Sequence, residues 1–171
     1  VRSRGLGDVY KRQIYTMELG RKGELVNQDK DQAILTLMDM EPIIETNFVP
    51  VYTDMLLKDV VYEAIAKSSR NIFPVLDRDT QEFKGVILLD DIRHLMFQKE
   101  LYEKVSVIEM MQAPPARIEM DTDRMTQVMD KFQQTGAWNL PVVKEGKYIG
   151  FISKSKLLTV YRRKLIYFST R

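Results

Sequence analysis

Two stretches of the chain decide the fold, because they repeat one another. Residues 71–92 read NIFPVLDRDTQEFKGVILLDDI, and residues 138–157 read WNLPVVKEGKYIGFISKSKL. Each contains an apolar run with a Pro-Val pair, a short polar turn, and a second apolar run that begins at a glycine. Apolar runs flanking a turn are typical of a β-hairpin, and proline is tolerated near the start of such a strand. The repetition therefore predicts two copies of one folded unit.

Apolar residues at helical spacing precede each hairpin. The spacing is the same in the two sets, which are Leu57, Val60, Val61 and Ala64, and Met125, Val128, Met129 and Phe132. Such spacing predicts an amphipathic helix. Short strands at residues 49–51 and 117–119 and a closing helix after each hairpin complete a β-α-β-β-α unit. A three-stranded sheet covered on one face buries little apolar surface alone, so we expect the two units to pack as one α/β (α+β) body with pseudo-two-fold symmetry.

The chain divides into six segments by composition. They are a non-native leader (1–13), a charged connector with a helix (14–37), the first repeat (38–99), a linker (100–107), the second repeat (108–161) and a basic C-terminal tail (162–171). We expect the connector helix to cover residues 32–38, with Asp29 or Asp31 as its N-cap. Residues 98–107 are expected to continue the preceding helix before they become a linker.

The composition excludes several classes of protein. The 171 residues include 44% hydrophobic residues and no cysteine, and the net charge is only +2. Disulfides and thiol chemistry are therefore excluded, a cytoplasmic location is favoured, and no nucleic-acid partner is expected. No apolar stretch approaches the roughly 20 residues of a membrane helix. His94 is the only histidine, and no catalytic motif accompanies it, so we expect neither an enzyme nor a metal site.

The hairpin motif resembles that of a known family. A Pro-Val strand followed by Gly-apolar-apolar-(Ser/Thr)-x-x-Asp resembles the CBS domain, and two copies in tandem resemble a Bateman module. The resemblance implies a cleft between the units that holds an adenine nucleotide. It also implies that the hydroxyl and the aspartate meet phosphate and ribose, while residues just before the Pro-Val strand cradle adenine. Each motif here lacks one anchor: the first unit keeps Asp91 but has Leu88 in place of the hydroxyl, and the second keeps Ser153 but has Lys156 in place of the aspartate.

The incomplete motifs suggest two unequal sites. One would combine Asp91 as ribose acceptor with Trp138 as adenine platform, and the opposite site would combine Asn71, Ser153 and Lys156, favouring a phosphate or no ligand. AMP, ADP, ATP and adenosine are the candidate ligands, no cofactor is required, and ATP should bind weakly or not at all. In the alternative interpretation Trp138 is a packing residue, Asp91 caps a helix, and the other polar residues are solvated.

Residues 14–23, IYTMELGRKG, resemble the connector that follows the last membrane helix of ClC-family chloride channels and transporters. This resemblance implies a regulatory tail at the cytoplasmic face of a membrane, which modulates chloride transport and dimer stability beside the membrane-embedded domain. Two alternatives are a freestanding or enzyme-linked CBS energy sensor that binds AMP or ATP, and a ligand-free dimerisation scaffold. A homodimer is expected because the helix faces of Leu57, Val61, Met125 and Met129 could cover a second copy.

Overall fold

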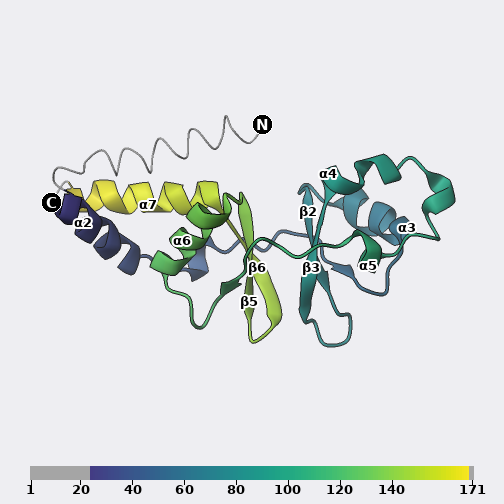
Figure 1. The fold of residues 1–171 in the computed structure, drawn as a ribbon, viewed down its shortest axis with the longest axis horizontal. Coiled ribbons are helices and arrows are strands. Elements are labelled where there is room, and N and C mark those ends of the chain that lie inside the picture. The colour runs from purple at the N-terminus through teal and green to yellow at the C-terminus, as the bar shows by residue number, and fades with distance from the viewer. Residues whose placement is uncertain (1–23, 170–171) are drawn as a thin grey trace.

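Two small sheets form the centre of the molecule. The computed structural model describes residues 24–169, so the predicted leader (1–13) and the stretch 14–23 lie outside the described residues. Each sheet has three strands, in the orders β1-β2-β3 and β4-β5-β6, and Figure 1 shows the sheets side by side with helices toward the two outer ends. The strands are β1 (Val51–Tyr52), β2 (Ile72–Leu76), β3 (Phe83–Leu88), β4 (Ile118–Glu119), β5 (Asn139–Lys144) and β6 (Lys147–Ser153).

The two sheets have the same internal arrangement. In each, the first strand pairs parallel with the second and the second pairs antiparallel with the third. Pro74 lies opposite Val86 and Pro141 lies opposite Phe151, so the two prolines occupy equivalent positions in the register. This mixed α+β architecture of two equivalent units confirms the predicted fold class.

The helices of the first unit are short and irregular. They are α3 (Leu57–Asp59), which continues through η3 (Val60–Ala64) and η4 (Ile65–Lys67), then α4 (Leu89–Ile92), η5 (Arg93–Leu95), η6 (Lys99–Leu101) and α5 (Val107–Met110). The expectation of one continuing helix over residues 98–107 is wrong. Gln98 has a non-helical backbone, with φ −108° and ψ 83°, and Ser106 starts α5 by accepting a hydrogen bond from the Glu109 N–H.

Longer helices cover the second unit. They are α2 (Glu24–Thr36), α6 (Met125–Thr135) and α7 (Lys154–Ser169), and η2 (Glu41–Ile43) follows α2. The predicted helix at 32–38 is present, but its bounds and its aspartate cap are wrong, since α2 begins at Glu24 and both Asp29 and Asp31 lie inside it. Its residues Ile34 and Leu35 are buried in the core of the second unit, and Asp31 accepts a hydrogen bond from Tyr161 of α7. These contacts hold the C-terminal half of α2 against the second unit.

Three apolar clusters hold the molecule together. One lies in each unit, and a third joins the sheets through Phe48, Leu76, Phe83, Val86, Val143 and Phe151. Leu57, Met125 and Met129 are buried within the chain at 0%, 5% and 4% exposure, and Val61 is half-buried. The prediction that these side chains cover a second copy is wrong, because helical spacing marked the face that packs on the chain's own sheets.

Each unit lends a segment of backbone to the other. Glu45, which precedes β1 of the first unit, pairs with Phe151 of β6, and Gln112, which precedes β4 of the second unit, pairs with Val86 of β3. The crossing backbone passes so close to β3 and β6 that no side chain fits at the facing strand positions. A Cβ atom at Gly150 would lie 2.5 Å from the Glu45 carbonyl oxygen, and one at Gly85 would lie 2.8 Å from that of Gln112. The glycines that lead the two motifs are thus required by these crossing segments.

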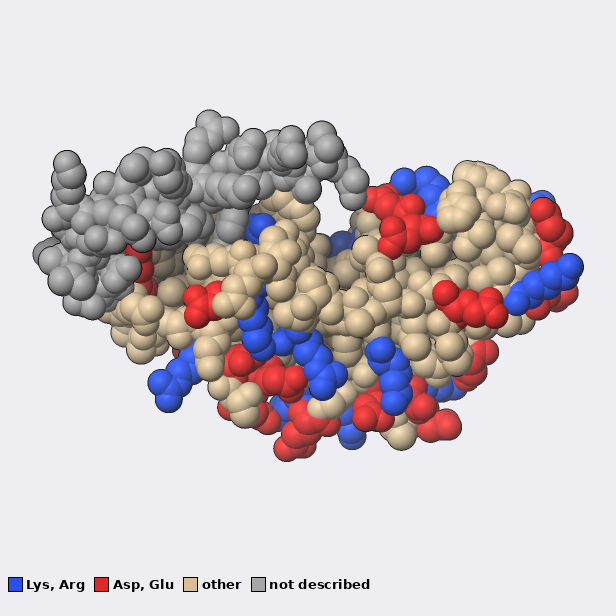
Figure 2. All heavy atoms as spheres, in the orientation of Figure 1, with Lys and Arg blue, Asp and Glu red and all other residues tan. Residues whose placement is uncertain are grey.

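The described surface carries both signs of charge. Figure 2 shows basic and acidic side chains interspersed along the lower edge of the face that it presents. Such mixing gives little of the single-sign field that attracts a polyelectrolyte. Within residues 24–169, moreover, none of the helices is long and apolar enough to cross a membrane.

Candidate functional site

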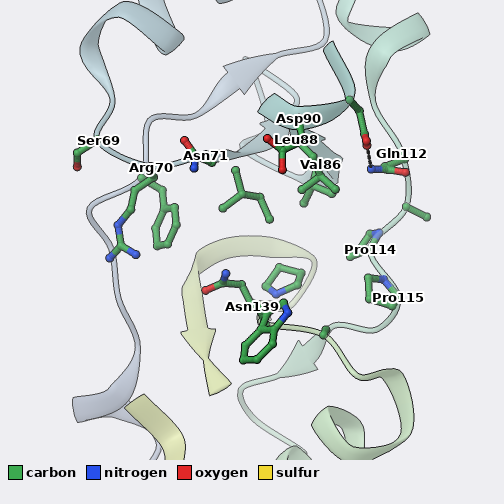
Figure 3. A pocket seen from close by; sticks show the side chains of 17 residues that line it. Ser69, Arg70, Asn71, Val86, Leu88, Asp90, Gln112, Pro114, Pro115 and Asn139 are labelled. Carbon is green, nitrogen blue, oxygen red and sulfur yellow. Dashed lines mark hydrogen bonds between the residues drawn. The ribbon is translucent and has the colours of Figure 1, made fainter. Parts of the chain in front are cut away.

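A cavity of about 630 Å³ lies between the two units. Its walls come from the residues that precede β2 and β5, the end of β3, the start of α4 and the linker before the second unit. The polar side chains among its lining are Ser69, Arg70, Asn71, Asp90, Asp91, Gln112, Trp138 and Asn139. Figure 3 shows Asn71, Leu88 and Asp90 on one side of this cavity and Asn139 and Pro115 on the other. A volume of this size is typical of small-molecule sites.

Asp91 stands at the start of α4 and is held by a neighbouring side chain of the cavity wall. Its Oδ2 accepts a hydrogen bond of 2.8 Å from the Gln112 side-chain amide, drawn as the dashed line in Figure 3. The Leu89 N–H donates to the Asn71 carbonyl oxygen at 2.9 Å, which fixes the start of α4 beside the start of β2. The carboxylate of Asp91 is therefore positioned by groups from both the hairpin and the linker.

Trp138 lies on the opposite wall, just before β5. Its side chain is 37% exposed, and the Lys154 ammonium lies 4.3 Å from the ring centroid. Lys154 is itself only 2% exposed, and burial lowers its pKa from the ordinary value. Its backbone N–H donates to the Trp138 carbonyl oxygen at 2.9 Å. The indole is thus held against a buried cation, and a cation over an aromatic face is a favourable contact.

The structure brings three of the five predicted site residues together. Asp91 and Trp138, assigned to one site from opposite units, line the same cavity, and Asn71 lines it with them. Asn71 was assigned to the opposite site, yet its place beside the start of α4 puts it in this cavity. Ser153 and Lys156 are not among the lining residues. They lie near Glu45 on the other side of the pseudo-two-fold, where both influence the ionisation of its carboxyl group.

A compact polar group surrounds Glu45, and we call Glu45, Arg70, Ser153 and Lys156 the Glu45 cluster. The Glu45 carboxylate accepts a hydrogen bond of 2.7 Å from Arg70. Burial raises the pKa of the Glu45 carboxyl group, but hydrogen bonds from Arg70 and Ser153 outweigh burial and hold this pKa below its ordinary value. The positive charge of Lys156 lowers it further. The carboxylate is therefore held in its ionised form, with Arg70 as a direct partner.

Arg70 is fixed on several sides. Its Nη2 also donates to the Asn47 side-chain oxygen at 2.7 Å, and its guanidinium lies 4.4 Å from the centroid of the Phe48 ring. Although Arg70 lines the cavity, its guanidinium points away from the centre in Figure 3. Its charge is thus directed at Glu45.

Sequence reasoning missed Gln112, Lys154, Arg70 and Glu45. The first and last lie on the crossing segments, outside the hairpin motifs. The one available signal was the glycine inside each of β3 and β6, Gly85 and Gly150, since glycine inside a strand often marks close approach of another backbone. Lys154 is the residue of the second unit that corresponds to Leu89 of the first. The alignment of the two units therefore predicts that its side chain is buried, although a lysine is seldom buried.

Comparison with known proteins gives the fold a context. The sequence profile of the CBS domain matches residues 40–98 and 107–163, while no curated protein sequence matches significantly. The structure of CbpB in complex with c-di-AMP gives a TM-score of 0.65 at 17% identity, over 83% of this chain and 96% of that one. The structure of CBSX2 in complex with AMP gives a TM-score of 0.56 at 21% sequence identity, over 71% of this chain and 94% of that one. The CBS domain of a CBS-domain-containing membrane protein from Sphaerobacter thermophilus gives a TM-score of 0.60 at 19% sequence identity, over 80% of this chain and 97% of that one. At these identities the likeness shows a shared fold.

Proposed function

Because the chain belongs to the CBS-domain family and carries two tandem copies, we propose that it is a regulatory module that binds an adenine nucleoside or nucleotide between them. The observation that carries this proposal is the position of Asp91 and Trp138, which come from opposite units and line one cavity. The complexes of CbpB with c-di-AMP and of CBSX2 with AMP support the same class of ligand.

The two residues supply complementary chemistry. A carboxylate can accept both hydroxyl hydrogens of a ribose, and hydrogen bonds to a charged group contribute about 1.5–3 kcal/mol each. An indole can stack on a purine, which contributes about 1–3 kcal/mol. Residues from the two units would thus bind the two halves of one nucleoside. Binding would then change the free energy with which the units pack together, and a regulatory module requires such a differential effect.

The charges of the cavity favour a nucleoside over a triphosphate. Asp90 and Asp91 both line it, and Asp90 is paired with exposed Arg93 at 2.9 Å. The guanidinium among the lining residues, that of Arg70, is bound to Glu45. A phosphate chain would therefore meet two carboxylates near a cation that is already neutralised. We expect adenosine to bind at least as tightly as AMP, and ATP to bind most weakly.

Calorimetric titration with adenosine, AMP and ATP tests the proposal. Asp91→Ala should weaken adenosine binding by about 1.5–3 kcal/mol through loss of charge-assisted hydrogen bonds, and Trp138→Ala by about 1–3 kcal/mol through loss of stacking. Lys156→Ala is the matched control, since Lys156 does not line the cavity. If adenosine binds and only Lys156→Ala weakens it, the ligand occupies a different site.

We further propose that the parent protein is a ClC-family chloride channel or chloride/proton antiporter, and that this chain is its cytoplasmic regulatory tail. Residues 14–23 support this proposal by their resemblance to the ClC connector. The similarity to the CBS domain of a membrane protein is consistent with it. The reading frame upstream should encode several apolar helices, and deleting the tail should alter chloride flux in vesicles. An upstream frame without such helices would favour a freestanding energy sensor.

A further inference from the structure

The two crossing segments place equivalent residues beside the two motifs. Gln112 exchanges two backbone hydrogen bonds of 2.9 Å with Val86, and Glu45 exchanges two of 2.7 and 2.9 Å with Phe151. Val86 and Phe151 each follow the leading glycine of their motif. Glu45 is therefore the pseudo-symmetric counterpart of Gln112, although the two differ in charge.

The difference in charge matches the difference between the motifs. Beside the cavity the motif ends in an acceptor, Asp91, and the crossing residue is a donor, the Gln112 amide. On the other side the motif offers donors, Ser153 and Lys156, and the crossing residue is an acceptor, Glu45. The second unit thus retains the groups that would attract an anion, and the chain itself supplies the anion.

We propose that Glu45 is an internal ligand whose carboxylate occupies the anion position formed by Arg70, Ser153 and Lys156 and excludes phosphate-bearing ligands from it. Each chain then takes up one adenine ligand, in the Asp91–Trp138 cavity; this stoichiometry rests on the proposed function. Glu45 is an autoinhibitory contact in the sense that its removal exposes a second binding site, one for phosphate groups.

The backbone makes Glu45 an effective competitor. Its two hydrogen bonds to Phe151 fix the residue in place, so its carboxylate reaches Arg70 without the loss of translational freedom that an external phosphate incurs on binding. Arg70 is held in the same place by Asn47 and Phe48. Without the Glu45 charge, Arg70 would lose the carboxylate that it contacts at 2.7 Å, and the positive charges of Arg70 and Lys156, which both act on that carboxyl group, would favour another anion in its place.

Pyrophosphate is a suitable probe, because it carries phosphate charge without adenine. We expect calorimetry to show no saturable binding to the wild-type chain up to about 1 mM, whereas Glu45→Gln should bind pyrophosphate at least about ten-fold more tightly, since charge-assisted hydrogen bonds to a phosphate are strong. The double variant Glu45→Gln/Lys156→Gln should lose this gain. Saturable binding of pyrophosphate to the wild-type chain below about 1 mM would overturn the proposal, whatever affinities the variants show.

Adenosine titrations of the same samples separate this inference from the proposed function. Adenosine should bind the wild-type chain and Glu45→Gln alike, because its cavity does not include Glu45. If adenosine fails to bind either protein while pyrophosphate binds only Glu45→Gln, the proposed function fails and the inference stands. If Glu45→Gln melts like the wild type and gains no pyrophosphate binding, the inference fails. Glu45→Ala serves as the second variant if Glu45→Gln does not fold.

Discussion

Tyr148 shows how a single residue between the two units can be both well packed and energetically unfavourable. Its ring lies 6.4 Å from that of Phe83 and 5.7 Å from that of Phe151, measured between centroids. Its hydroxyl is buried and has no hydrogen-bond partner among the described residues. Burial raises the pKa of Tyr148 well above its ordinary value, against a smaller opposing effect of the Arg70 charge. A buried, unpaired hydroxyl is destabilising by about 1–3 kcal/mol.

Tyr148→Phe should therefore stabilise the fold. The variant keeps the ring contacts and removes the unpaired hydroxyl, so we expect the free energy of unfolding to rise by about 1 kcal/mol.

The raised pKa of Tyr148 also makes the stability of the wild type depend on pH. As the pH rises above about 10, Tyr148 loses its proton in the unfolded chain before it does so in the folded chain. The folded state then binds more protons, and the free energy of unfolding falls with rising pH. Tyr148→Phe should reduce this alkaline loss. Tyr161, whose pKa is also raised by burial and by its bond to Asp31, should maintain part of it. Urea titrations at about pH 8 and about pH 10.5 measure both effects, and a lower stability at the lower pH would contradict the interpretation.

At the residue scale, sequence spacing could place Asp91 and Trp138 but not their neighbours. The motif repeats at a fixed distance from the Pro-Val strand, so the two positions follow from aligning the units. Gln112, the partner of Asp91, and Glu45, the partner of Arg70, lie on segments that cross to the other unit, and a linear pattern carries no information on that exchange. Whether the paired residues bind a ligand stays a prediction.

At the scale of elements, the two crossing segments precede β1 and β4, and each pairs with the last strand of the other unit's sheet. Gly85 and Gly150 allow this contact, and the space at Gly150 is the tighter of the two. There a Cβ atom would also lie 2.7 Å from the Ile44 side chain, whereas at Gly85 the side-chain neighbour, Met111, is 3.7 Å away. The segment containing Glu45 is consequently the more closely packed crossing.

Gly150→Ala should destabilise the fold more than Gly85→Ala. Overpacking of this kind is destabilising by about 1–3 kcal/mol, and we expect Gly150→Ala near the upper end because both backbone and side chain of residues 44–45 must move. Thermal and urea unfolding of the two variants side by side measure the difference. Because the shift would displace Glu45, Gly150→Ala should also admit pyrophosphate. Equal stability of the two variants would show that the crossing segments yield more easily than their geometry indicates.

The sequence predicted strands better than helices, and packing explains the difference. The hairpins follow from alternating apolar runs and polar turns, which are local features. The packing of α2 depends instead on Ile34 and Leu35, which are buried against the second unit. The break after η5 occurs at Gln98, whose backbone is non-helical, and Ser106 begins the separate helix α5 with its own side-chain cap. Neither feature is contained in the periodicity of the segment itself.

At the scale of the whole molecule, the two units share one apolar cluster between their sheets and exchange backbone segments. They should therefore unfold together rather than one at a time, because separating them would expose the shared cluster and break both crossings. Several exposed apolar side chains lie on or beside the helices on the outside of this body. On the first unit these include Tyr62, Phe97 and Ile108, exposed by 54%, 80% and 58%.

We predict that the chain forms a dimer through these helices of the first unit. Exposed apolar side chains of this size are typical of a contact with a second copy. The interface would therefore involve these side chains and not the helix faces of Leu57, Val61, Met125 and Met129. Sedimentation at tens of micromolar, a range suited to weak interfaces, should show a dimer that Ile108→Glu converts to monomer. Ile166→Glu is the matched control, since Ile166 is equally apolar and 64% exposed on α7 of the second unit. If Ile166→Glu dissociates the dimer and Ile108→Glu does not, the two copies meet through the second unit. If the wild-type chain is monomeric at these concentrations, the prediction of a dimer is wrong.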